Sequence, residues 1–173
     1  MFNQHGFGST SMAQLMEATG LEKGGLYRHF ESKEEIALEV FNYSEEISYG
    51  EAFDHLEKIA DPVLRLKTFV KSFAKKIPIE GGCPIFNTAV ENDHSNTKLR
   101  AAASAAFNAR IKQLAKWFTE AQKSKRIKLE VPATEAALHL FCSLEGALIA
   151  RDLTGSEHSM RSTERILIAF IEG

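Results

Sequence analysis

Apolar residues recur along this chain at intervals of three and four, a spacing that places side chains on one face of an α-helix. Four sets show the spacing best: Ile36, Val40, Tyr43 and Ile47; Leu66, Val70, Phe73 and Ile77; Phe107, Ile111, Leu114, Phe118 and Ala121; and Ala137, Phe141, Leu144 and Leu148. We find no convincing segment that alternates apolar and polar residues as a β-strand does. The pattern predicts an all-α fold.

Residues typical of helix ends separate these segments, namely capping boxes, prolines in first turns and glycines after last turns. They stand at Ser11 with Gln14, Ser32 with Glu35, Pro62, Pro132, Gly81–Gly82 and Gly155. The combined pattern predicts helices over 11–18, 22–29, 32–53, 62–77, 84–93, 97–124, 133–153 and 159–172.

Composition narrows the class of protein. Of the 173 residues, 44% are hydrophobic and 25% are charged, values typical of a soluble globular protein. No apolar run approaches the roughly 20 residues that span a bilayer, and the N-terminus does not resemble a signal peptide. Two cysteines, Cys83 and Cys142, form neither a disulfide framework nor a metal-site spacing. We expect a cytoplasmic protein with no membrane partner, metal or cofactor.

Two short predicted helices, 11–18 and 22–29, are joined by Thr19-Gly20-Leu21. A glycine in a tight turn between short helices is typical of a helix-turn-helix, and Gly20 can adopt the positive φ that such a turn needs. A small core would come from Met12, Leu15, Met16, Leu21, Leu26 and Phe30. Near its start, the second helix would offer DNA the residues Lys23, Gly24, Gly25, Tyr27 and Arg28. The pattern alone leaves DNA binding and a plain helix pair equally open.

Four stretches of this segment form one ordered motif: Gly6-Phe7-Gly8-Ser9-Thr10-Ser11-Met12, Ala18-Thr19-Gly20-Leu21, Lys23-Gly24-Gly25-Leu26-Tyr27-Arg28-His29-Phe30 and Ser32-Lys33-Glu34-Glu35. Together they resemble the DNA-binding segment of TetR-family repressors. The resemblance implies that Thr10 and Ser11 begin the first helix of the motif and touch phosphate. It places Lys23, Gly24 and Gly25 at base-reading positions. It also implies that Tyr27, His29 and Lys33 hold the DNA backbone.

Some of these residues also have plain structural interpretations. Phe30 fits a core aromatic, His29 fits a cap or a packed side chain, and Lys33 fits a solvated lysine paired with nearby glutamates. The sequence also departs from the family pattern in three ways. Residues 1–7 look like only the end of the helix that the family has before this motif, so we expect the first helix to be incomplete. Glu22 stands where the family often has serine or threonine. Residues 1–50 hold three lysines and arginines against eight acidic residues, a net charge of −5 that opposes phosphate binding.

A second segment, Gly81-Gly82-Cys83-Pro84-Ile85-Phe86-Asn87 with Glu91 and Asn96-Thr97-Lys98-Leu99-Arg100, resembles one subgroup of the same family. The resemblance implies a helix-turn-helix domain over 1–45 and a larger helical effector-binding and dimerisation domain over 46–173. It further implies a homodimer formed through the last two helices. The apolar residues of 133–153 and 159–172 fit such an interface, because helices this apolar need cover.

Candidate effector-binding residues are aromatic and apolar side chains that could line a cavity between helices, together with two polar residues. They are Phe69, Phe73, Phe86, Asn87, Phe107, Ile111, Phe118, Phe141 and Glu145. A solid core is an equal alternative for each of the apolar ones. Cys83 beside Pro84 suggests an acidified thiol at a helix start, with a packing role as the alternative.

We expect a ligand-responsive transcriptional regulator, a repressor that a small apolar or amphipathic effector releases from double-stranded operator DNA. Two alternatives stay open. The acidic and histidine residues Glu91, Asp93 and His94 suggest an enzyme, although they lack the usual metal-ligand spacing. The second alternative is a helical dimer that serves as an interaction or small-molecule-binding module without DNA. The basic excess from Lys98 to Lys128 fits a solvated helix face.

Overall fold

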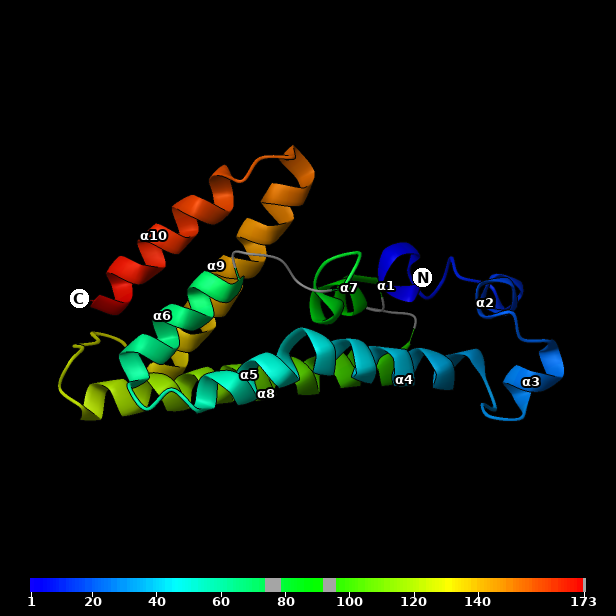
Figure 1. Ribbon diagram of the computed structural model, residues 1–173, viewed down its shortest axis with the longest axis horizontal. Helices are drawn as coiled ribbons and strands as arrows, with labels where there is room; N and C mark the ends of the chain where they lie inside the picture. The colour runs from blue at the N-terminus through cyan, green and yellow to red at the C-terminus, as the bar shows by residue number, and fades with distance from the viewer. Residues whose placement is uncertain (74–78, 92–95, 173) are drawn as a thin grey trace. The chain divides into compact units, whose positions relative to one another are not determined.

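The computed structural model describes residues 1–73, 79–91 and 96–172. Over these residues the chain is helical and no strand occurs, which confirms the all-α prediction (Figure 1). The elements are α1 (Phe2–His5), α2 (Met12–Thr19), α3 (Lys23–Tyr27), α4 (Lys33–Glu45), η1 (Glu46–Gly50), α5 (Glu51–Glu57), α6 (Pro62–Phe73), α7 (Pro84–Glu91), α8 (Thr97–Lys123), α9 (Ala133–Thr154) and α10 (His158–Glu172).

Most helix ends lie within two residues of the prediction. The largest difference follows α4, where the chain continues through the π-helical turn η1 into α5 and ends at Glu57 instead of residue 53. At Gly50, the last residue of η1, a Cβ would meet the end of the Glu46 side chain, which would have to shift. The predicted ends of helices 62–77 and 84–93, including Ile77, lie outside the described residues.

The apolar set that the spacing places on one face of α4 is exposed at two of its residues. Val40 is 36% exposed and Tyr43 is 69% exposed. The helix instead buries Ile36, Ala37, Phe41 and Ser44. Both sets have helical spacing, so the spacing alone does not decide which of them is buried. The other three faces hold at their described residues, although Phe107 and Ile111 are only half-buried.

Contacts between residues divide the chain into two compact units. Unit 1 contains Met1–Gly50 and Pro78–Ala106, and unit 2 contains Glu51–Ile77 and Phe107–Gly173. The division falls between η1 and α5 and again within α8. It differs from the predicted domains 1–45 and 46–173, because α7 contacts α1 and α4 and so belongs with the N-terminal residues.

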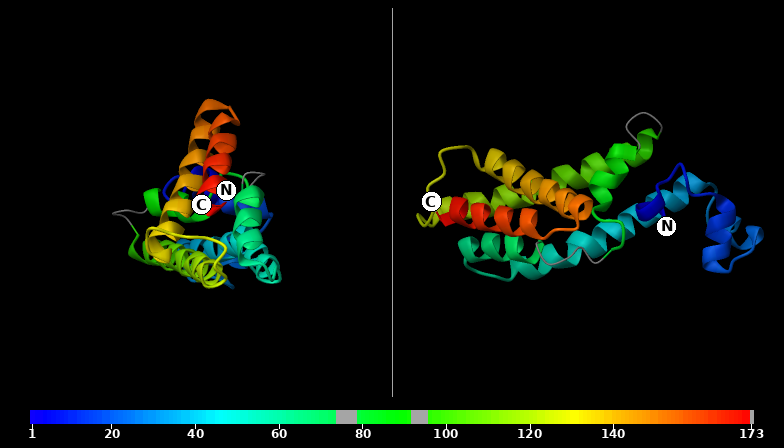
Figure 2. Two further views of the ribbon diagram at one scale, coloured as in Figure 1. Left: turned by 90° about the vertical axis from the view of Figure 1, so that its left-hand side faces the viewer. Right: turned by 90° about the horizontal axis from the view of Figure 1, so that it is seen from above.

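Unit 2 is built around α9, which packs against α10, while α10 also contacts α6 (Figures 1 and 2). Gly155 ends α9 in the left-handed conformation, with φ 66°, as its position predicted. The core here contains the large, fully buried side chains Leu66, Leu114, Trp117, Phe118, Phe141, Leu144 and Leu167.

By length and composition alone, α9 is apolar enough to cross a membrane, which the prediction that no apolar run is long enough did not anticipate. Its burial gives a simpler reason for that composition. It buries Ala136, Leu140, Phe141 and Leu144 inside unit 2, and the core helices of globular proteins pass the same test. Glu145, fully buried in the same helix, would be costly in a bilayer.

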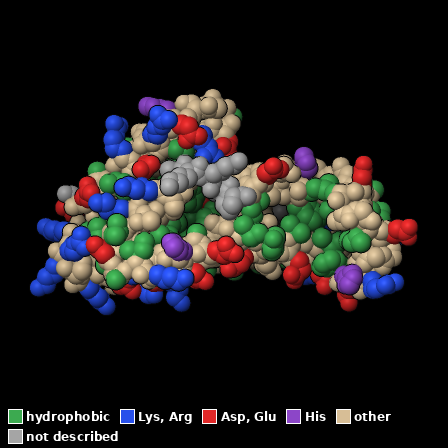
Figure 3. All heavy atoms as spheres, viewed as in Figure 1, with side chains coloured by type: hydrophobic (Ala, Val, Ile, Leu, Met, Phe, Trp, Pro, Cys, Tyr) green, Lys and Arg blue, Asp and Glu red, His purple; other side chains and the backbone are tan. Residues whose placement is uncertain are grey.

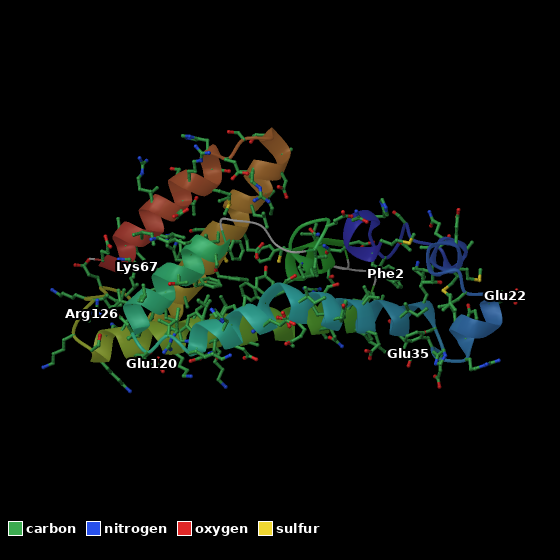
Figure 4. All side chains as sticks on the ribbon, viewed as in Figure 1. Phe2, Glu22, Glu35, Lys67, Glu120 and Arg126 are labelled. Atoms are coloured by element: carbon green, nitrogen blue, oxygen red, sulfur yellow. The ribbon has the colours of Figure 1, made fainter. Side chains whose placement is uncertain are left out.

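A buried arginine joins α5, α6 and α8. The Arg65 guanidinium donates to the Ile59 carbonyl through Nε and Nη2, and to Glu120 through Nη1 at 2.7 Å. Glu57 lies 3.3 Å from the same guanidinium and accepts hydrogen bonds from Trp117 at 2.9 Å and Lys116 at 3.0 Å. Figure 4 labels Glu120 in this region. Burial raises the pKa of Glu57, but these hydrogen bonds and positive charges outweigh it and hold the pKa below its usual value.

The substitution Glu57→Gln should lower the free energy of unfolding by about 1–2 kcal/mol at pH 7, since it removes charge-assisted hydrogen bonds. A carboxyl whose pKa is lowered by folding stabilises the protein above its unfolded pKa and loses that effect as the pH falls through the folded value. Urea titrations at fixed protein concentration should therefore show the difference shrinking below pH 4. The exposed Glu130→Gln variant should have the same free energy of unfolding as the wild type, both at pH 7 and in the acidic range.

Candidate nucleic-acid interface

Unit 1 contains the two short helices α2 and α3, and a reciprocal cap fixes the start of α2. Ser11 Oγ accepts the backbone N–H of Gln14 at 3.2 Å, and Gln14 Oε1 accepts the backbone N–H of Ser11 at 2.7 Å. This is the capping box that the sequence predicted. The second predicted box is half formed: Ser32 accepts from the Glu35 N–H, but the Glu35 carboxylate accepts from Glu31 instead.

The turn between α2 and α3 depends on Gly20. It ends α2 in the left-handed conformation, with φ 68°, which confirms the reason for expecting glycine there. Helix α3 then covers only Lys23–Tyr27, shorter than the predicted 22–29. Glu22, labelled in Figure 4, is its N-cap but makes no side-chain capping hydrogen bond.

A small apolar core holds the two helices together. Its buried residues are Leu15, Leu26 and Ile36, with Phe2, Met12, Met16 and Phe30 packed against them. Five of the six predicted core residues belong to this set. The prediction that Leu21 belongs to this core was wrong. Leu21 lies in the turn before α3 and is 45% exposed, with its side chain beside Gly25.

The residues predicted to read DNA lie on an exposed surface of α3 and the turn after it. Lys23, Tyr27, Arg28 and His29 are exposed, and the Lys23 amine lies 5.8 Å from the centre of the Tyr27 ring. Gly24 is exposed with open space where a side chain would be, so another molecule can approach its backbone. This surface has the polar, cationic and accessible character that nucleic-acid binding needs.

Three further predicted DNA contacts lie outside α3. Thr10 is only 1% exposed, and its hydroxyl donates to the Gly6 carbonyl at 2.7 Å. It therefore serves the fold, and α2 begins after it. Ser11 is exposed. Lys33 is half-buried, with its amine 4.3 Å from the centre of the Phe7 ring, an orienting contact that differs from an ordinary solvated lysine.

The charge around this surface is unfavourable for DNA at long range. On the face drawn in Figure 3, the part that carries α1 to α4 shows more acidic than basic side chains. Lys98 partly offsets this: its amine donates to Glu34 at 2.7 Å, and that hydrogen bond holds the pKa of Glu34 below its usual value. Binding must therefore come from a few local cations and backbone groups.

The predicted effector residues fall into two sets. In unit 2, the rings of Phe69, Phe73, Phe141 and Phe107 follow one another at 5.8, 6.2 and 5.8 Å between centres. Phe118 instead pairs with Phe170 of α10 at 6.3 Å. Sequence reasoning missed Phe53 and Trp117, whose rings lie 5.0 Å apart beside Phe69. Ile111 is half-buried and Glu145 fully buried.

Phe86 and Asn87 belong to unit 1. The Asn87 amide already donates to the Gly81 carbonyl and to Asn3 Oδ1. Cys83 is also buried there, and the Tyr49 hydroxyl donates to its sulfur at 3.0 Å. Of the acidic and histidine residues that suggested an enzyme, Asp93 and His94 lie outside the described residues. Glu91 accepts backbone N–H groups from Phe7 and Gly8.

Comparisons of sequence agree with this geometry. Residues 1–40 match the model described as "Bacterial regulatory proteins, tetR family", and residues 62–167 match "Tetracyclin repressor-like, C-terminal domain". The HTH-type transcriptional regulator LmrA of Bacillus subtilis is 28% identical over 154 residues, covering 86% of this chain and 79% of LmrA. The HTH-type transcriptional repressor DhaR of a Mycobacterium species is 24% identical over 158 residues, covering 86% of this chain and 75% of DhaR.

Comparisons of structure give the same family. The crystal structure of a TetR transcriptional regulator from Chloroflexus aurantiacus is similar to this one with a TM-score of 0.89. The two chains are 34% identical, and the match covers 98% of this chain and 87% of that one.

The turn at Gly20 can be tested with two replacements. Because space around it is open, only the backbone conformation should matter. Gly20→Val should destabilise unit 1 by about 1–2 kcal/mol, the cost of left-handed backbone for a residue with a side chain. Gly20→Asn should cost less, since asparagine tolerates this conformation. Amide hydrogen exchange across α2 and α3 measures both, and equal exchange rates in the two variants would contradict the account.

Proposed function

Because this chain belongs to the TetR family of DNA-binding transcriptional regulators, we propose that it is a ligand-responsive repressor that binds its operator through α3. The single observation that carries the proposal is the exposed surface of α3, held by the Gly20 turn and by the core around Leu26. The names of LmrA, a regulator, and DhaR, a repressor, support the proposal by likeness.

In the proposed complex, α3 enters the major groove. Lys23 and the backbone at Gly24 and Gly25 approach base edges, and Tyr27, Arg28, His29 and Lys33 hold phosphates. Ser11 lies at the exposed start of α2, where helix N–H groups attract phosphate. Thr10 is left out of the interface because its hydroxyl is already used by Gly6. Two copies of α3 would reach half-sites roughly 34–36 Å apart, one turn of DNA.

The second copy is proposed to dock on an exposed apolar stripe of α9. Leu138, Ile149 and Leu153 are 44%, 55% and 83% exposed, and Cys142 and Gly146 lie between them at helical spacing. No neighbouring atom lies within 4 Å of the position that a Gly146 side chain would occupy. Small residues in the middle of an apolar stripe allow two helices to cross closely. Ile166 and Ala169 of α10 are also exposed and extend the apolar surface.

The effector is proposed to be a small apolar or amphipathic molecule that binds unit 2 beside the Phe69, Phe73, Phe107 and Phe141 rings. Aromatic side chains with few polar groups are typical of such sites, and the fully buried Glu145 is a candidate polar group. The effector would favour one arrangement of the dimer over another and so shift the population away from the DNA-binding state. We place this activity in the cytoplasm. The family is regulatory, and its match does not favour a DNA-independent module or an enzyme.

Two variants test the DNA surface. Lys33→Ala should weaken operator binding and reduce the slope of log Kd against log salt by about 1, because one phosphate contact is lost. Tyr27→Phe should weaken binding roughly threefold to tenfold with the slope unchanged, since only a neutral hydrogen bond is lost. Fluorescence anisotropy across a salt series measures both effects.

Lys71→Ala, an exposed lysine of α6, is the matched control and should bind operator like the wild type. Wild-type affinity in both the Lys33 and the Tyr27 variant would remove these residues from the interface.

Ile149→Glu tests the dimer surface. In the proposed interface two introduced carboxylates would meet across the two-fold axis. Like-charge contacts cost several kcal/mol, so the dimer dissociation constant should rise roughly a hundredfold or more. Sedimentation velocity over a concentration series measures it. Leu64→Glu places the same charge at a 52% exposed position of α6 and should leave the dimer intact. An unchanged dimer in Ile149→Glu would place the interface elsewhere.

A further inference from the structure

The segment 80–91, which includes Gly81-Gly82-Cys83-Pro84-Ile85-Phe86-Asn87 and Glu91, has no part in the function proposed above. In unit 1 this segment contacts the first residues of the chain: α7 and the loop before it form hydrogen bonds with residues 3–8. We propose that residues 80–91 form a seat for the DNA-binding head, residues 1–45, and that Glu91 and Asn87 are positioning residues for operator binding. This inference rests on the proposed operator binding.

Glu91 holds the loop that follows α1. Its Oε2 accepts the backbone N–H of Phe7 at 2.6 Å, and its Oε1 accepts the backbone N–H of Gly8 at 2.7 Å. Two successive backbone donors that converge on one carboxylate form a compact anion site. Hydrogen bonds to a charged acceptor are also shorter and stronger than neutral ones. One side chain of α7 therefore fixes the direction of the chain at residues 7 and 8.

Asn87 and Asn3 form a second tie between α7 and α1. Asn87 Nδ2 lies 2.6 Å from the Gly81 carbonyl and 3.1 Å from Asn3 Oδ1, and it donates to both. Asn3 Nδ2 in turn donates to the carbonyls of Glu80 and Gly82, at 2.8 and 2.9 Å. These hydrogen bonds hold the Asn87 side chain toward Asn3 of the head.

Glycines on both sides of the contact make this close approach possible. Gly6 has φ 86°, and a Cβ there would lie 2.5 Å from Glu91 Oε1. Gly81 has φ 94°, and a Cβ there would collide with the Asn3 carbonyl. At both positions the positive φ disfavours a side chain. At Gly81 a Cβ would also collide with backbone, whereas at Gly6 it would displace the Glu91 carboxylate from the loop.

The seated loop leads directly to the DNA surface. Thr10 ties the loop to Gly6 immediately before the cap of α2 at Ser11. The Phe7 ring contacts the Lys33 amine at 4.3 Å and stacks on Phe2 at 6.1 Å. Phe2, labelled in Figure 4, packs on the core that holds α3. Displacement of residues 7 and 8 would thus move the start of α2, a phosphate-binding lysine and the support of α3.

Because Glu91 is charged, the direction in which its substitution changes operator affinity distinguishes positioning from simple electrostatics. Removing an acidic charge near DNA should tighten binding if electrostatics alone acts. The seat predicts the opposite: in Glu91→Gln, only one acceptor oxygen remains for two N–H groups. We expect operator Kd, measured by anisotropy on the intact dimer, to rise roughly tenfold or more. The slope of log Kd against log salt should fall by at most about 1, because Lys33 is the one proposed phosphate-binding cation that rests on this loop. Exchange of the Phe7 and Gly8 amides should accelerate.

Four further variants separate positioning from general damage. Glu91→Asp keeps two acceptor oxygens and should recover part of the affinity. Glu39→Gln removes the same charge from an exposed position of α4 outside residues 80–91, so it should not weaken binding. Gly6→Ala should weaken binding as Glu91→Gln does, whereas Gly8→Ala, whose Cβ would lie an ordinary 3.5 Å from Glu91, should not.

Wild-type or tighter operator binding by Glu91→Gln, or wild-type binding by Gly6→Ala, would overturn the inference. Absence of specific binding by the wild-type protein would instead contradict the proposed function. In that case amide exchange decides about the seat alone: unchanged protection at residues 7 and 8 in Glu91→Gln would overturn it, and accelerated exchange would support it.

Discussion

The helix proposed to read DNA is too short to hold itself. A helix of five residues such as α3 is unstable in water, because nucleation costs more than so few hydrogen bonds return. Its position therefore depends on the burial of Leu26 against residues from α1, α2 and α4. The Gly20 turn sets its direction, and α1 supplies Phe2 to its core. The elements around α3 therefore supply the packing that a helix of five residues lacks by itself.

The same need explains why the head and α7 form one compact unit. The loop after α1 has backbone N–H groups at Phe7 and Gly8 that no helix satisfies. Glu91 of α7 accepts these N–H groups, and Asn87 of α7 donates to Asn3 of α1. The glycines at 6 and 81 make room for the contact. Residues 1–50 carry a net charge of −5, which opposes long-range attraction to DNA. Accurate positioning of a few donors then matters more than the total charge.

Local signals predicted most of the fold. The capping box at Ser11, the turn at Gly20 and the apolar spacing of α6, α8 and α9 each depend on residues close in sequence. Tertiary packing decided the rest. On α4, Val40 and Tyr43 of the apolar set are exposed, whereas the helix buries Ile36, Ala37, Phe41 and Ser44. For the site, the motif gave the exposed residues of α3. It gave no sign that Thr10 is buried or that Asn87 binds Asn3, a partner 84 residues away.

The central claim is that the head presents α3 to a specific DNA sequence. The most direct measurement is an anisotropy titration of the protein against DNA from upstream of its own gene, at near-physiological salt, with a shuffled sequence of equal length and composition as competitor. The account predicts saturable binding that the shuffled DNA does not displace. Equal affinity for both DNAs, or no binding to either, would contradict it.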